Sequence, residues 1–222
     1  MPENPARLGI ASTLPPPKPT TIIPTMLDEE LRKSAKPLYA PLTAPLANRM
    51  SGNAVSLAGL AVGVLCLALV ALGYNAFALV FWLANRLLDG LDGEVARIRG
   101  EASEFGSFLD IAADFFMYGG LLVALAIQHE DARLALAVLF LAYYLNGSLF
   151  LALSSVLERL KAERKTERGL HFRRSLTEGF ETIMFGVLAL ALPAYISPIV
   201  WIFAAMVFIS AIQRLLDARR ML

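Results

Sequence analysis

Four aspartates in the middle of the chain, Asp89, Asp92, Asp110 and Asp114, have the residue type and the spacing to do chemistry. Residues three or four apart share one face of a helix, so each pair predicts a stripe of carboxylates. Hard cations such as Mg²⁺ and Mn²⁺ prefer oxygen ligands of this kind. Both histidines lie outside this segment, which argues against zinc. We therefore expect a site for Mg²⁺ or Mn²⁺.

Small residues accompany both stripes. Gly93 and Ala96 follow the first pair of aspartates, and Gly106 precedes the second pair. A chain reversal between Arg97 and Ser103 would turn the two stripes toward each other. Glycine lets a ligand approach the backbone closely. The spacing thus predicts one polar pocket that both pairs of aspartates line.

The elements that must position these residues are transmembrane helices. Of the 222 residues, 57% are hydrophobic and 18% are charged, whereas a soluble domain has roughly 45–50% and about 25%. The apolar residues form runs close to the ~20 residues that a bilayer span needs, which excludes an ordinary water-soluble enzyme. We predict an all-α polytopic membrane protein with six transmembrane helices, near 53–73, 75–98, 103–128, 132–158, 175–193 and 196–216.

The distribution of Lys and Arg predicts the orientation in the membrane. The turns 73–75, 129–131 and 193–198 contain no Lys or Arg, while basic residues gather at the opposite ends of the spans, above all in the loop 159–174. By the positive-inside rule, both termini and the aspartates face the cytoplasm. Without a signal or transit peptide before the first apolar run, a bacterial inner membrane is the expected location.

Three regions follow from composition. Residues 1–25 contain seven prolines and predict a disordered cytosolic tail. Residues 26–52 predict a juxtamembrane interfacial segment, in which the repeated PLxA motif over 37–48 is expected to be kinked or extended because proline opposes a helix. Residues 53–222 form the predicted six-helix domain. A net charge of +1 provides no global field to attract nucleic acid, so we expect no nucleic-acid partner.

Three arginines stand out. Arg173 and Arg174 precede the fifth span on the same membrane side as the aspartates and are candidates to bind a phosphate of a substrate. Arg86 lies one helical turn before Asp89, where an ion pair and a functional role explain it equally well.

The segment from Asp89 to Asp114 fits the pattern D-x2-D-G-x2-A-R-x8-G-x3-D-x3-D at every specified position. It therefore resembles the signature of the CDP-alcohol phosphotransferases, also called CDP-alcohol phosphatidyltransferases. Asn53-x-x-Ser56 is similar to the P-N-x-x-T that precedes the first span in that family, with Gly52 in place of the proline and Ser56 in place of the threonine.

The resemblance implies displacement of CMP from a CDP-linked lipid, usually CDP-diacylglycerol, by a small alcohol. It also implies a homodimer. Metal binding would fall to Asp89, Asp92, Asp110 and Asp114, and Asp114 would also be the general base on the acceptor hydroxyl. The cytidine diphosphate would lie along Asn53, Ser56, Gly93, Ala96, Arg97 and Gly106.

Two other functions fit parts of the sequence. Asn85-x-x-x-Asp89 followed by Asp92 faintly resembles the first aspartate motif of membrane aromatic prenyltransferases, although no second acid-rich motif follows. Intramembrane acids also suit a cation or proton carrier. Within the transferase hypothesis, glycerol-3-phosphate, inositol phosphate, serine and inositol are all open as acceptors, and Arg173 with Arg174 favours a phosphorylated one.

Overall fold

The computed structural model describes residues 41–164 and 179–222, and in these two ranges every regular element is helical. The prediction of an all-α protein is confirmed. After a helical segment over 41–47, six helices and two short 3₁₀ turns follow one another along the described residues: α2 Gly52–Ala71, α3 Asn75–Arg99, α4 Glu104–Gln128, η1 Glu130–Ala132, α5 Arg133–Arg164, α6 Gly179–Ala191, η2 Pro193–Tyr195 and α7 Ile196–Met221.

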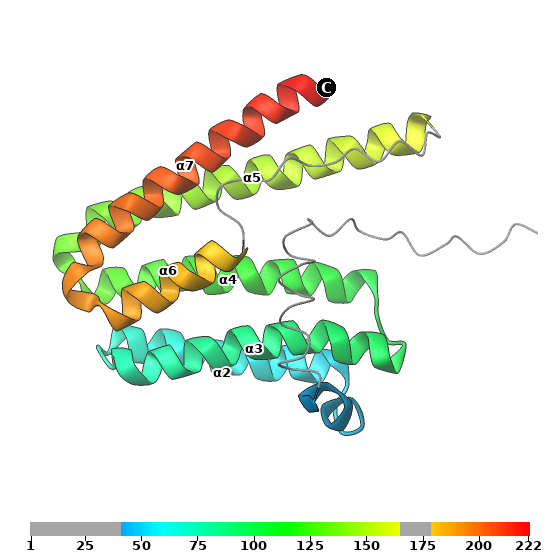
Figure 1. Ribbon diagram of the computed structural model, residues 1–222, viewed down its shortest axis with the longest axis horizontal. Helices are drawn as coiled ribbons and strands as arrows, with labels where there is room; N and C mark the ends of the chain where they lie inside the picture. The colour runs from blue at the N-terminus through cyan, green and yellow to red at the C-terminus, as the bar shows by residue number, and fades with distance from the viewer. Residues whose placement is uncertain (1–40, 165–178) are drawn as a thin grey trace, which may run out of the picture.

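The helices run back and forth between two ends of the molecule (Figure 1). The turns from α2 to α3, from α4 to α5 and from α6 to α7 lie together at the left of the view, and the α3–α4 connection lies at the right. α2 packs against both α3 and α4, while α5 pairs with α7. The aspartates of α3 and α4 therefore lie toward the same end of the bundle.

The helices have the length and the surface of membrane spans. Four of those described are long and apolar enough to cross a bilayer: α2, α4, α5 with η1, and α7 with η2. Large apolar side chains such as Leu57, Phe77 and Leu134 are 65–70% exposed, as expected of side chains that face lipid. α3 carries Arg86 and two of the four aspartates, Asp89 and Asp92, and α6 has 13 described residues. Six spans in all is still a prediction.

The expected chain reversal between the two stripes is present. α3 ends at Arg99, and Gly100 takes a left-handed conformation with φ +67° that favours glycine. α4 begins at Glu104, and the side chain of Ser103 caps it by accepting a hydrogen bond from the Gly106 amide over 3.1 Å.

Two glycines allow α2 to approach its neighbours closely. A Cβ at Gly52 would lie 2.7 Å from the Cβ of Ala96 on α3, and a Cβ at Gly63 would lie 2.4 Å from the sulfur of Met117 on α4. Real Cβ atoms do not come this close to other atoms, so a larger residue at Gly52 would push α2 and α3 apart, whereas one at Gly63 would force the flexible end of the Met117 side chain to move. These contacts fix α2 against the two helices that carry the aspartates.

The N-terminal predictions are only partly tested. The tail over 1–25 and the first part of the juxtamembrane segment lie outside the described residues. The expectation that the PLxA repeat is kinked or extended is wrong where the structure describes it, because residues 41–47 are helical and include Pro41 and Pro45. Packing compensates for the lost backbone bonds: Thr43 and Ala47 are buried, and the latter joins an apolar cluster with residues of α2 and α3.

Candidate active site

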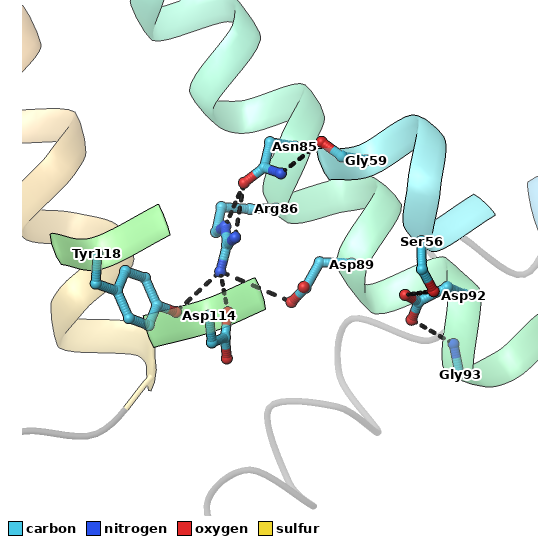
Figure 2. Close-up of polar contacts among 9 residues, drawn as sticks. All are labelled: Ser56, Gly59, Asn85, Arg86, Asp89, Asp92, Gly93, Asp114 and Tyr118. Carbon is cyan, nitrogen blue, oxygen red and sulfur yellow. Dashed lines mark hydrogen bonds and ion pairs between the residues drawn. The ribbon is translucent and has the colours of Figure 1, made fainter. Parts of the chain in front are cut away.

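Asp89 on α3 and Asp114 on α4 approach the same guanidinium group, that of Arg86 (Figure 2). Nη1 of Arg86 lies 2.7 Å from Oδ1 of Asp114 and 3.7 Å from Oδ2 of Asp89. The first and last aspartates of the motif are thus brought together across two helices, with a positive charge between them. The pairing of Arg86 with Asp89 was one of its two expected roles, and the shorter contact to Asp114 was not expected.

The guanidinium is almost enclosed, with 6% of the Arg86 side chain exposed. Nε and Nη2 both donate to Oδ1 of Asn85, over 2.9 and 2.6 Å, and Nη1 also donates to the Tyr118 hydroxyl over 2.9 Å. The rings of Trp82 and Tyr118 lie 5.3 and 5.1 Å from its central carbon. Hydrogen bonds and aromatic faces therefore hold this cation in place.

Asn85 connects this cluster to α2. Its Nδ2 donates to the carbonyl of Gly59 over 2.8 Å, while its Oδ1 accepts from Arg86. A continuous polar chain consequently runs from the backbone of α2, through Asn85 and Arg86 on α3, to Asp114 and Tyr118 on α4.

Asp92 occupies a second polar position, closer to the end of α3. Its Oδ2 accepts a hydrogen bond from the hydroxyl of Ser56 on α2 over 2.5 Å, and its Oδ1 accepts from the amide of Gly93 over 2.5 Å. Figure 2 shows this contact to one side of the Arg86 cluster, with Asp89 between the two. Ser56 and Gly93, both expected to contact the nucleotide, therefore each form a hydrogen bond with Asp92, an expected metal ligand.

The four aspartates supply the oxygen donors that a hard cation prefers. Besides its contact with Arg86, Asp89 interacts electrostatically with Asp92, Asp110 and Asp114. Within residues 41–164 and 179–222, no three His, Cys, Asp or Glu side chains converge closely enough to hold one ion. The oxygen donors of these carboxylates fit Mg²⁺ or Mn²⁺ in chemistry, and one ion would be shared by them only if their side chains lay closer together than they do here.

The other residues predicted to contact the nucleotide lie around the ends of α2, α3 and α4. Asn53 is exposed in the first turn of α2, and Ala96 packs against Gly52. Arg97 is exposed and forms an ion pair of 2.9 Å with Glu94. Gly106 lies in the first turn of α4, with its amide bonded to the cap.

Some site residues were not expected from the sequence. The sequence had suggested no role for Tyr118 in the site, and Asn85 had been considered only within the prenyltransferase motif. A signal was present for Tyr118, because it follows Asp114 by four residues and continues the stripe from Asp110. Arg173 and Arg174, the candidate acceptor residues, lie outside the described residues.

Comparison with known proteins agrees with the motif. The chain is 36% identical over 196 residues to the inner membrane protein YnjF of Escherichia coli, covering 85% of this chain and 93% of that protein. It is 29% identical over 204 residues to a phosphatidylinositol phosphate synthase of Corynebacterium glutamicum, covering 87% and 89%.

Solved structures show the same fold. Phosphatidylinositol phosphate synthase (PgsA1) of Mycobacterium tuberculosis with CDP-DAG bound superposes with a TM-score of 0.65 at 19% identity, covering 80% of this chain and 92% of that one. The same enzyme in complex with manganese and citrate gives a TM-score of 0.66 at 20% identity, covering 81% and 88%.

The family comparison covers most of the chain. The model of the CDP-alcohol phosphatidyltransferases matches residues 49–213, which include α2 to α6, most of α7 and all four aspartates. The protein is an integral membrane member of the CDP-alcohol phosphatidyltransferase family.

Proposed function

We propose that the protein transfers the phosphatidyl group of CDP-diacylglycerol to an alcohol and releases CMP. One observation carries the proposal: in a chain of this family, the complete aspartate motif is folded so that Asp89 and Asp114 approach one another across α3 and α4. An aromatic prenyltransferase or a cation carrier has no comparable support. The related enzyme solved with CDP-DAG supports the choice of the lipid substrate.

In the proposed reaction, Asp114 is the general base. It accepts the proton of the acceptor hydroxyl, whose oxygen attacks the phosphorus that carries diacylglycerol. The bond from that phosphorus to the bridging oxygen breaks, and CMP leaves with the electron pair. Oδ1 of Asp114 is held by Arg86, and Figure 2 shows the second carboxylate oxygen directed away from Arg86, so that oxygen is the one we assign to take the proton.

The remaining aspartates are the proposed metal ligands. Asp89, Asp92 and Asp110 would hold Mg²⁺ or Mn²⁺, with Asp114 beside them, and the related structure with manganese supports this choice. When bound, the metal supplies positive charge to the diphosphate and to the leaving CMP. Asn53, Ser56, Gly93, Ala96, Arg97 and Gly106 would line the cytidine diphosphate.

The proposed orientation places the site at the cytoplasmic surface of a bacterial inner membrane. The last turns of α3 and α7 carry Arg97, Arg99, Arg219 and Arg220, and the chain reversal between the aspartates lies at the same end as the first of these turns. The positive-inside rule assigns that end to the cytoplasm. A water-soluble head group and a lipid tail then reach the site from opposite directions. We propose a homodimer on the basis of the family.

For the acceptor, we propose a phosphorylated alcohol such as glycerol-3-phosphate or inositol phosphate. Arg173 and Arg174 in the sequence support it, as does the related phosphatidylinositol phosphate synthase. The test is release of CMP from CDP-diacylglycerol by purified protein with Mn²⁺ and a panel of phosphorylated and unphosphorylated alcohols. Faster release with a phosphorylated acceptor is expected, and release that serine or inositol stimulates most would refute this choice.

A further inference from the structure

Arg86 has no part in the family motif, yet it is the most enclosed charge of the site. Its side chain is 6% exposed, while those of Asp89 and Asp114 are 29% and 36% exposed. A buried arginine in a membrane protein is costly unless its charge and its donors are matched. Every nitrogen of this guanidinium has an acceptor, so the surroundings are built around it.

The arrangement constrains the guanidinium from two sides. On one edge of the guanidinium, Nε and Nη2 both donate hydrogen bonds to Asn85. The side chain of Asn85 is itself held by its hydrogen bond to the carbonyl of Gly59 on α2. The remaining nitrogen, Nη1, points at Oδ1 of Asp114 over 2.7 Å and at the Tyr118 hydroxyl over 2.9 Å. The cation therefore cannot follow Asp114 freely. It sets where that carboxylate lies.

We propose that Arg86 is a positioning residue and the built-in counter-ion of the site. It holds Oδ1 of Asp114 so that the other oxygen faces the acceptor, and its charge stabilises the neighbouring carboxylates when no metal ion is bound. The inference rests on the proposed function for the role of Asp114, although the counter-ion role does not depend on catalysis.

The counter-ion role predicts that Arg86 weakens the binding of a metal ion to the aspartates. A fixed positive charge next to Asp89 and Asp114 opposes the approach of a divalent cation, because like charges a few ångströms apart repel strongly at the dielectric constant of a partly buried site. Removing the charge should tighten cation binding. If Arg86 only kept the aspartates in place, its removal would weaken cation binding instead, because carboxylates that are no longer held together bind a metal ion more weakly.

The experiment compares Arg86→Met and Arg86→Lys with the wild-type chain in detergent, using Mn²⁺ alone as the probe and electron paramagnetic resonance to measure its Kd. Arg86→Met should bind Mn²⁺ about tenfold more tightly or better, whereas Arg86→Lys, which keeps the charge, should stay within about threefold of wild type. Arg133→Met is the control, since this exposed arginine pairs with Glu130 near the opposite end of α4. An unchanged or weaker Mn²⁺ affinity in Arg86→Met overturns the proposal.

Thermal unfolding and kinetics provide independent readouts. In EDTA, Arg86→Met should melt roughly 5–15 °C below wild type, and saturating Mn²⁺ should recover more of this loss than it adds to wild type. Lysine replaces the three nitrogens of the planar guanidinium by a single one and loses the fixed fork that joins Asn85 to Asp114, so the kcat of Arg86→Lys should fall while its KM for CDP-diacylglycerol stays near that of wild type. A fall confined to stability, with kcat unchanged, would contradict the positioning role.

A second pair of variants answers the same question if Arg86→Met does not fold. Asp114→Asn and the double variant Arg86→Met/Asp114→Asn differ by the same cation, and the double variant should bind Mn²⁺ more tightly. If wild type releases no CMP with any acceptor while these affinities follow the predicted order, the proposed function fails and the counter-ion role stands. If wild type releases CMP but the order is reversed, only the inference about Arg86 fails.

Discussion

The hydroxyl of Ser56 on α2 donates a hydrogen bond of 2.5 Å to Oδ2 of Asp92 on α3. This contact between residues 36 positions apart joins the two parts of the sequence that resemble the family signature, the Asn53-x-x-Ser56 motif and the aspartate string. Serine in place of the family's threonine keeps the hydroxyl that this contact requires. The substitution therefore preserves the support of Asp92.

Replacing Ser56 with alanine should weaken the site without unfolding the protein. Hydrogen bonds to charged groups contribute about 1.5–3 kcal/mol, so kcat/KM for CDP-diacylglycerol should fall roughly 10- to 100-fold, and Ser56→Thr should retain most of the activity. Steady-state CMP release measures both. Ser210→Ala on α7 is the control, because the Ser210 hydroxyl donates to Met206 of its own helix, away from the aspartates. Full activity in Ser56→Ala would show that the hydrogen bond is dispensable.

Gly52 should not tolerate a side chain. A Cβ there would lie 2.7 Å from the Cβ of Ala96, so Gly52→Ala should destabilise the protein by about 1–3 kcal/mol and lower its melting temperature in detergent. The second change Ala96→Gly should restore much of the loss. Gly90→Ala on α3 is the matched control, because no atom lies within 4 Å of a Cβ at that position. Equal melting temperatures for Gly52→Ala and Gly90→Ala would disprove the close approach.

Asn85→Ala should destabilise the protein more than an ordinary surface change. The substitution removes the acceptor of two Arg86 hydrogen bonds and the donor to Gly59, leaving a buried cation with unmatched donors. We expect a loss of about 2 kcal/mol or more, measured by thermal or denaturant unfolding in detergent. Asn48→Ala, at an exposed asparagine beyond the helix over 41–47, should be near wild type. Similar unfolding curves for the two variants would refute the role of Asn85.

Activity should depend on a hard divalent cation. Treatment with EDTA should abolish CMP release, and added Mg²⁺ or Mn²⁺ should restore it, because carboxylate oxygens supply the proposed ligand set. Asp89→Asn should require a higher metal concentration for half-maximal rate. Undiminished CMP release in EDTA, after dialysis against metal-free buffer, would count against a metal site among these aspartates.

The sequence predicted the helices and the pairing of the two stripes, because these follow from local rules. The spacing of Asp110 and Asp114 needs only helical periodicity, and the reversal is marked by Gly100 and Ser103, whose left-handed conformation and capping hydroxyl are local signals. The same rules misjudged the helix over residues 41–47. Its prolines disfavour it locally, whereas burial of Thr43 and Ala47, the latter packed with residues of α2 and α3, favours it.

The partner of Arg86 could not be predicted from its own helix. Spacing along α3 offers Asp89 as the neighbour, whereas the shorter contact is to Asp114 on α4. Which residue of α4 faces Arg86 depends on how α4 is rotated about its axis and on its packing against α2, which also contacts α3. Tertiary packing of this kind is absent from the periodicity of a single segment.

The most direct test of the account is the rate of CMP release by Asp114→Asn. Asparagine keeps the size of the side chain and an acceptor for Arg86 but cannot take the proton of the acceptor alcohol. We predict a fall of at least about 100-fold with folding intact, while Asp131→Asn, at an exposed aspartate in η1, leaves the rate unchanged. CMP release by Asp114→Asn at the wild-type rate would contradict the assignment of Asp114 as the base.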